Sequence, residues 1–131
     1  MADLLQSICT YMVSSGELSD LAIGDTLCYG TIPQNGPDLC SVVMENVGME
    51  VDADLRTARQ VRLQILTRGP SYYEARTEAL RIFDWLVELQ GVQLSGWWLY
   101  HVVGTGPANI GKDGLGREEF SSNSTLFLRK E

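Results

Sequence analysis

Residues 71–91 read SYYEARTEALRIFDWLVELQG and carry the strongest helix signal in the chain. Ser71 and, three residues later, Glu74 form a capping box, a pattern with which helices often begin. Apolar side chains then recur at helical spacing, and Gly91 is a residue type that commonly ends a helix. The stretch predicts a helix of about 18 residues whose apolar stripe needs a sheet to pack on. The stripe consists of Ala75, Ala79, Ile82, Phe83, Leu86 and Val87.

Strand signals flank this helix on both sides. Residues 61–67 alternate between apolar and polar side chains, the pattern of a strand with one buried face. Residues 97–103 are apolar or aromatic everywhere except at His101, which predicts a strand covered on both faces. Further strands are predicted at 27–29, 39–45 and 118–129, a second helix at 3–14, and loops at 33–37, 47–59 and 104–116.

The order of these elements is helix, strands, helix, strands, without a repeated strand–helix–strand unit. It predicts an α+β fold with a mixed or antiparallel sheet of about four to six strands and two helices packed on it. A chain of 131 residues fits one domain, so we expect residues 1–131 to share one core. Three cysteines, Cys9, Cys28 and Cys40, lack metal-ligand spacing and are predicted to be buried thiols.

The charge balance limits the partners. Seventeen acidic against ten basic residues give a formal net charge of −7. Such a charge repels nucleic acid unless basic residues cluster, and the arginines of 56–68 are interrupted by uncharged residues. No stretch is apolar enough for a membrane span, and the first residues lack a secretory signal. We therefore expect no specific nucleic-acid binding, no membrane partner and a location in the cytoplasm.

Residues 106–112 read GPANIGK and match the beginning of a phosphate-binding P-loop. That motif continues with Ser or Thr, which holds Mg²⁺, and with a helix whose N-terminus faces the phosphates. Here Asp113 follows, and then Gly114 and Gly116, which disfavour a helix. We therefore predict no nucleotide or other cofactor. A small nucleotide-binding enzyme built on this segment is the less favoured alternative.

Two further groups of residues could carry chemistry. Glu45, Glu50, Asp52 and Asp54 could hold a hard cation, but the calcium-loop pattern is missing, so a solvated acidic loop is predicted. His101 is the only histidine and has no sequence signature of a nucleophile beside it. We predict no metal site and no catalytic residue, and hence no enzyme.

Trp98 and Tyr100 share one face of their predicted strand, whereas Trp97 and Leu99 share the other. One of the two faces must be covered by something other than the long helix. The helix at 3–14 could lie behind the sheet, or the face could be a subunit interface, where aromatic residues are enriched. The sequence leaves both alternatives open.

Four features carry a resemblance to a known family. They are the N-terminal helix, the Gly36-Pro37-Asp38 start of a strand, the strand 61–69 that leads through Arg68-Gly69 into a helix with Tyr73, Glu74 and Ala75, and the stretch 107–122 with Ile110-Gly111-Lys112-Asp113, Gly116-Arg117 and Phe120-Ser121. In this order they resemble the small minor capsid or tail-terminator proteins of bacteriophages with long, non-contractile tails. The stretch 107–122 is similar to a hairpin of that family. The acidic loop 47–59 matches no residue of the family.

The resemblance implies a structural virion protein that forms a ring, hexameric by analogy, on the last ring of tail-tube protein. Such a ring ends tail elongation, joins the tail to the head connector at the head-proximal end, and lets DNA pass only as cargo. Another neck or head-completion protein of the same virion is the alternative. The candidate contact residues lie in two segments too polar for the core: Glu50, Asp52, Asp54, Lys112, Asp113 and Arg117.

Overall fold

A computed structural model describes residues 3–131 and contains two helices and six strands. The composition and order of the elements confirm the predicted α+β fold. In chain order they are α1 (Leu4–Ser14), β1 (Leu27–Tyr29), β2 (Cys40–Val51), β3 (Ala58–Gly69), α2 (Tyr72–Val87), β4 (Gln90–Leu94), β5 (Trp97–Lys112) and β6 (Glu118–Lys130).

The six strands form one mixed sheet in the order β1-β2-β3-β6-β5-β4. β1 runs parallel to β2, and every other neighbouring pair is antiparallel. The β3–β6 pair is the centre of the sheet, and its register runs without a shift from Ala58 opposite Arg129 to Gly69 opposite Glu118. Both edges are short strands, β1 with three residues and β4 with five, which limits the unpaired backbone that the sheet exposes.

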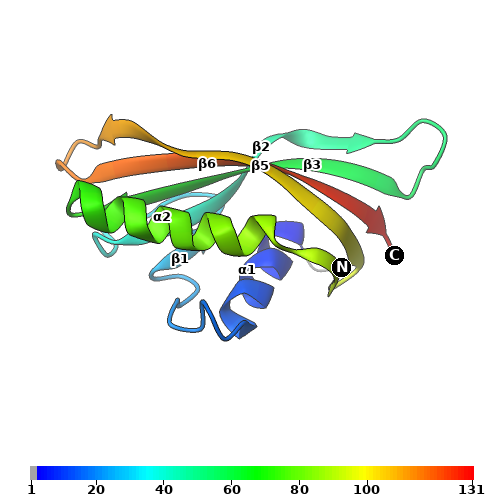
Figure 1. Ribbon diagram of the computed structural model, residues 1–131, viewed down its shortest axis with the longest axis horizontal. Coiled ribbons are helices and arrows are strands. Elements are labelled where there is room, and N and C mark those ends of the chain that lie inside the picture. Colours follow the sequence, from blue (N-terminus) through cyan, green and yellow to red (C-terminus); the bar gives the residue numbers. More distant parts are fainter. Residues whose placement is uncertain (1–2) are drawn as a thin grey trace.

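Both helices lie on the same face of the sheet (Figure 1). α2 lies along β3, β6 and β5, whereas α1 contacts β1 and β2 at one edge and β4 at the other. The sheet therefore curls around α1. This arrangement contradicts the alternative in which the first helix covers Trp98 and Tyr100 from behind. We call the opposite face, which carries Tyr100, Asn123 and Arg129, the open face; within residues 3–131 no helix covers it.

Both helices begin where the capping boxes predicted. The Ser71 hydroxyl accepts a hydrogen bond from the Glu74 amide at 3.2 Å, and an Asp3 carboxylate oxygen accepts one from the Gln6 amide at the same distance. α2 has 16 residues and ends at Val87, so the predicted end at Gly91 was wrong. Gly91 instead takes a positive φ of 63° inside β4. Neither helix of residues 3–131 has the length and apolar composition that a bilayer crossing requires.

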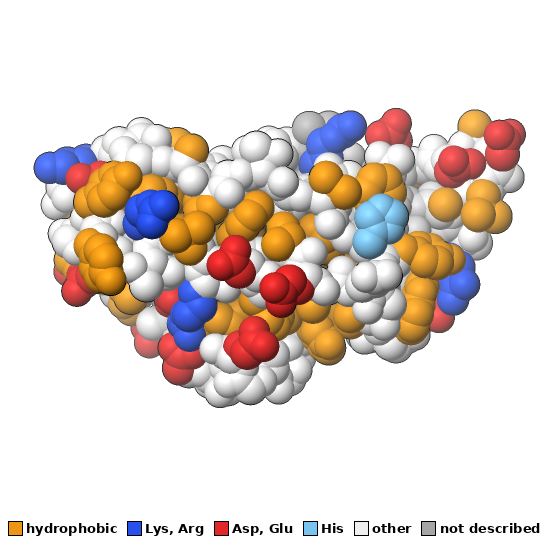
Figure 2. Space-filling view, in the orientation of Figure 1, with side chains coloured by type: hydrophobic (Ala, Val, Ile, Leu, Met, Phe, Trp, Pro, Cys, Tyr) orange, Lys and Arg blue, Asp and Glu red, His pale blue; other side chains and the backbone are white. Residues whose placement is uncertain are grey.

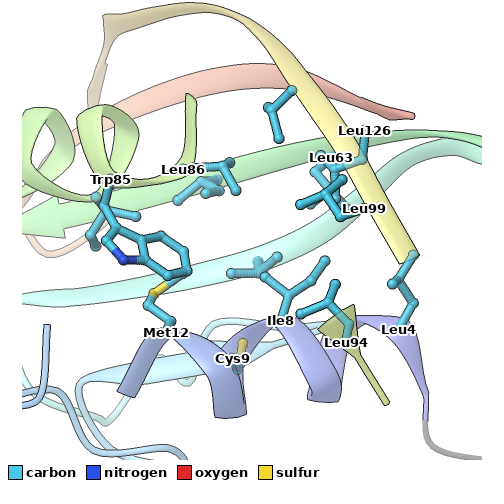
Figure 3. Close-up of a cluster of buried hydrophobic side chains, with 14 of the residues drawn as sticks. Leu4, Ile8, Cys9, Met12, Leu63, Trp85, Leu86, Leu94, Leu99 and Leu126 are labelled. Atoms are coloured by element: carbon cyan, nitrogen blue, oxygen red, sulfur yellow. The ribbon is translucent and has the colours of Figure 1, made fainter. Parts of the chain in front are cut away.

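The main core lies between the two helices and the sheet (Figure 3). Trp85 of α2 and Met12 of α1 point toward one another, and the Trp85 ring lies 5.9 Å from that of Tyr11, measured between centroids. Leu63, Leu99 and Leu126 close the core from the sheet. The helix stripe differs in part from the prediction: Trp85 is buried, whereas Phe83 and Val87 are half-buried.

Phe83 and Val87 lie over Gly104 of β5, and Val87 also packs against the edge of the main core. A Cβ added at Gly104 would come within 2.7 Å of a Val87 methyl and 2.9 Å of the Phe83 ring. A Cβ at Gly69 would lie 3.0 Å from the backbone of Ala75. Glycine at these two positions lets α2 approach the sheet closely.

A second apolar cluster lies on the open face under residues 31–38. It consists of Cys28, Cys40 and Val42, with Ile32, Met44 and Leu66 packed against it. All three cysteines are buried free thiols, as predicted. Burial raises the pKa of Cys9 to about 12 and that of Cys40 to about 11.

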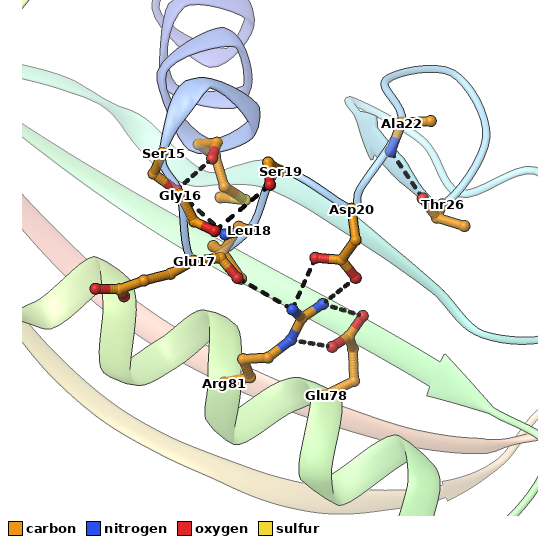
Figure 4. Close-up of polar contacts among 11 residues, drawn as sticks. Ser15, Gly16, Glu17, Leu18, Ser19, Asp20, Ala22, Thr26, Glu78 and Arg81 are labelled. Carbon is orange, nitrogen blue, oxygen red and sulfur yellow. Dashed lines mark hydrogen bonds and ion pairs between the residues drawn. The ribbon is translucent and has the colours of Figure 1, made fainter.

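A polar clamp ties the segment after α1 to α2 (Figure 4). The Arg81 guanidinium donates to both Asp20 carboxylate oxygens at 2.8 and 3.0 Å, to Glu78 at 2.7 Å and to the Glu17 carbonyl at 3.2 Å. The hydrogen bonds from Arg81 hold the pKa of Asp20 below its usual value. No local pattern predicts the contacts with Glu17 and Asp20, because these residues are about sixty positions from Arg81 in the chain.

Both long hairpins extend further than predicted. β2 runs to Val51 and β3 begins at Ala58, so the predicted loop 47–59 shrinks to residues 52–57. β5 runs through most of the predicted loop 104–116 and ends at Lys112. The prediction that 97–103 is covered on both faces was also wrong, because β5 lies next to the edge strand β4 and Val103 is 57% exposed.

Leu86→Ala should lower the free energy of unfolding by about 2–5 kcal/mol, because Leu86 is fully buried and its truncation leaves a cavity. Phe83→Ala should cost less, because Phe83 is half-buried. Tyr73→Ala is the matched control on the same helix: Tyr73 is 78% exposed, and its loss should change stability by about 0.5 kcal/mol or less. Urea denaturation measures all three. Equal costs at Leu86 and Tyr73 would mean that α2 packs with another face.

Candidate functional site

The six predicted contact residues lie in two groups at opposite ends of the sheet. Glu50, Asp52 and Asp54 belong to the β2–β3 hairpin, and Lys112, Asp113 and Arg117 belong to the β5–β6 hairpin. The two hairpin turns are far apart in Figure 1, so the structure does not bring the groups together into one site. Each group is therefore described by itself.

The acidic turn of the β2–β3 hairpin, residues 52–57, is ordered by Asp52. One oxygen of the Asp52 carboxylate accepts hydrogen bonds from the amides of Asp54 at 2.9 Å and Leu55 at 2.7 Å. These amides hold the pKa of Asp52 below its usual value. The turn presents the Leu55 side chain to solvent with 59% of it exposed, and Figure 2 shows carboxylates and hydrophobic side chains together at this right-hand end.

The contacts of the carboxylates in this turn do not favour cation binding. One Asp52 carboxylate oxygen already accepts hydrogen bonds from the backbone, and Glu50 lies 3.8 Å from Arg62 in an ion pair whose two side chains are both exposed. Over the residues that the structure describes, no group of three or more His, Cys, Asp or Glu side chains could enclose a metal ion.

The turn of the β5–β6 hairpin, residues 113–117, is ordered by Asp113 in a similar way. One oxygen of its carboxylate accepts from the amides of Leu115 and Arg117, both at 2.9 Å, and the other accepts from the Arg117 guanidinium at 2.7 Å. The backbone closes the turn with hydrogen bonds from Asp113 to Arg117 and from Gly116 to Asp113. Leu115 projects from this fixed turn with 65% of its surface exposed.

Arg117 is a buried residue, which corrects its assignment as an exposed arm. Only 6% of it is exposed, and besides Asp113 it bonds the Gln34 carbonyl at 3.1 Å and lies 3.7 Å from Asp38. Arg68, also buried, donates to the Pro37 carbonyl at 2.9 Å. The two arginines clamp residues 33–38 onto the hairpin, so a change at Arg117 should disturb the fold and not only a contact surface.

The carboxylates around this clamp have opposite pKa shifts. Burial alone would raise the pKa of Asp113, but the hydrogen bonds from Arg117 and Leu115 lower it overall. Burial raises the pKa of Glu119, and the nearby Asp113 charge adds to the rise despite Arg68 and Arg117. Lys112 stands apart: its side chain is 66% exposed, and its ammonium lies 4.0 Å from Glu118.

The P-loop-like residues 106–112 are part of β5. The chain then turns at 113–117 into β6, where a P-loop would continue into a helix. Asn109, inside the motif, bonds Glu118 at 3.1 Å and the Glu119 carbonyl at 3.3 Å across the hairpin. The segment therefore has the geometry of a hairpin arm rather than of a phosphate cradle.

The open face carries the aromatic residues whose cover the sequence left open. Tyr100 is 43% exposed and lies 5.9 Å from the Arg129 guanidinium, measured to the ring centroid. His101 stacks on Phe127 with 4.4 Å between ring centroids. Beside them lies a groove of about 480 Å³, lined by residues of β2, β3, β5, β6 and the β2–β3 turn. Its apolar lining is Val51, Ala53, Ala58, Tyr100, Phe127 and Leu128, and its polar lining is Glu50, Asp52, Arg59 and Gln60.

The sequence singled out the charged residues of both turns but missed the leucines that the turns present. Leu55 and Leu115 each follow an aspartate by two or three residues, and aspartate commonly folds such segments by bonding the amides after it. That pattern was the available signal.

A scan against protein-family models and a search of curated proteins both found no match for the chain.

Arg117→Ala should lower the free energy of unfolding by about 1–3 kcal/mol at neutral pH, because Asp113 and the Gln34 carbonyl lose their partner. The contribution of the Asp113 pair is present above the ordinary carboxyl pKa of 3.8 and is lost as the pH falls through the lowered value. The difference between parent and variant should therefore shrink in acid.

Lys112→Ala is the matched control, because this side chain is exposed and should change stability by about 0.5 kcal/mol or less. Chemical denaturation at neutral and acidic pH provides both comparisons. If Arg117→Ala leaves the free energy of unfolding unchanged at neutral pH, or if its effect grows on acidification, Arg117 does not hold this turn through Asp113.

Proposed function

We propose that this chain is a structural virion protein: one subunit of a closed ring that caps the tail tube of a long-tailed phage, ends its elongation and joins the tail to the head connector. The observation that carries the proposal is the pair of ordered turns at opposite ends of one sheet (Figure 1). Each turn exposes a leucine, and beside the turns Glu50 and Lys112 have exposed side chains whose ion-pair partners lie 3.8 and 4.0 Å away.

Contact sites at opposite ends of a subunit favour head-to-tail association. When one end of a copy binds the other end of the next, each copy keeps one free site, and the series stops only when it closes into a ring. A copy whose contacts lay on a single patch would form a dimer instead. The elongated sheet with its two hairpin turns therefore suits a ring subunit.

The charge of the chain suits a ring through which DNA passes. A net charge of −7 per copy repels phosphates over distances within a Debye length, so a ring of such copies would not retain DNA. The family resemblance supplies the remaining parts of the proposal, which are six copies and a position at the head-proximal end of the tail. The stretch 107–122 that carries most of this resemblance is a hairpin here as well.

The test is to add the protein to tail-tube protein that is polymerising, using the tube protein of the phage that encodes this chain. The parent protein should stop elongation and give shorter tubes in electron micrographs, because a cap occupies the end where subunits add. The effect should saturate at a small molar fraction, since only tube ends are bound. An unrelated acidic protein of similar size is the control for charge alone.

A tube-length distribution that the parent protein leaves unchanged at saturating concentration would contradict the capping function. Binding to isolated head connectors without any effect on tubes would instead favour the neck or head-completion protein.

A further inference from the structure

We propose that the β5–β6 turn of one copy docks into the groove beside the β2–β3 hairpin of a second copy, with Leu115 in the groove and Lys112 beside Glu50 and Asp52. The partner is therefore another copy of this chain. The inference rests on the proposed function for ring closure and copy number, but the contact itself can be tested without any tail tube.

The β5–β6 turn has a fixed shape before it binds. Three hydrogen bonds to the Asp113 carboxylate fix residues 113–117, and Arg117 anchors them to the body of the protein. Leu115 nevertheless has 65% of its surface in water. A rigid turn loses little conformational entropy when it binds, so an exposed apolar side chain on it is well suited to a contact.

The groove offers apolar walls that match the Leu115 side chain. Its volume of about 480 Å³ is open to solvent at Val51, which is 46% exposed, and at Tyr100, which is 43% exposed. Aromatic and aliphatic walls of this kind are typical of the central pockets of interfaces. Phe127 forms part of the same lining and is held in place by its stacking on His101.

The charges of the two sites also favour the contact. Lys112 is the one lysine or arginine among residues 106–116, and its 66% exposed side chain has only a distant contact with Glu118. The groove lining carries Glu50, whose side chain is 62% exposed, Asp52 and one arginine, Arg59. Its two carboxylates outnumber its one guanidinium, so the lining attracts the Lys112 ammonium.

The turn and the groove lie at opposite ends of the sheet, so one copy cannot close the contact on itself, and each of its two ends is available to a neighbouring copy (Figure 1). The contact is small, and we expect it to be weak between free copies. It should become stable when several copies are held together on one template, because linked sites act at effective concentrations of about 1 mM.

Two variants, each altered at one end, test the contact. The turn variant carries Lys112→Glu and Leu115→Asp, and the groove variant carries Glu50→Lys and Ala53→Lys; these side chains are exposed. At about 1 mM, the effective concentration on a template, the parent should sediment as oligomers and each variant alone as a monomer. An equimolar mixture should form heterodimers and stop there, because only one intact turn and one intact groove remain per pair.

Two controls separate a lost contact from a lost fold. Each variant should keep the circular dichroism spectrum and melting temperature of the parent within a few degrees. A chain with Tyr73→Asp and Arg76→Glu, exposed on α2, receives the same kind of charge change away from both ends and should associate like the parent. Glu50→Lys should also restore most of the association that Lys112→Glu alone weakens by about tenfold or more.

The contact is wrong if the parent stays monomeric at about 1 mM, if either variant alone still forms the parent oligomers, or if the mixture fails to dimerise. These outcomes are separate from a failure of the proposed function. Heterodimers together with unshortened tail tubes would support the contact and contradict the capping function. If the parent and both variants shorten the tubes equally, the capping function is supported and this contact is contradicted.

Discussion

The structure depends on the burial of Trp85 and Met12 between two helices that share one face of a curled sheet. α1 contacts the strands at both edges of the sheet, so its apolar stripe stabilises the curled shape. α2 packs on the central strands between them. Both apolar stripes are used on this face. The open face and the two hairpin turns are left without a helix, and the apolar side chains that they expose include Tyr100, Leu55 and Leu115.

Local signals in the sequence predicted local structure well. The N-caps at Asp3 and Ser71 need only neighbouring residues, and in both the side chain accepts the expected hydrogen bond from the backbone amide three residues on. The alternation at 61–67 likewise reports one buried face, and Val61, Leu63 and Ile65 are buried. Residues 104–112 were missed as a strand because most of them are exposed, so no alternation marks them. The side on which α1 packs depends on the curl of the whole sheet, which no local pattern encodes.

The same limit applies to the candidate site. Charged residues in turn-rich segments pointed to both hairpins. All six predicted residues lie in or beside the two turns, and five of them are not buried. Arg117 was misassigned because an arginine in a turn usually faces water, whereas here a carbonyl from residue 34 and two aspartates surround it. The groove could not be predicted, since its walls come from four strands that only the folded register brings together.

We interpret the two ordered turns at opposite ends of the sheet as sites of contact with other copies and other proteins. The central claim is that these contacts build a ring at one end of a tail tube. Electron cryomicroscopy of tail tubes incubated with the protein tests it most directly. The account predicts a single layer of repeated copies closing one end of each tube, with neighbouring copies joined end to end. Bare tube ends, or copies scattered along the tube wall, would contradict it.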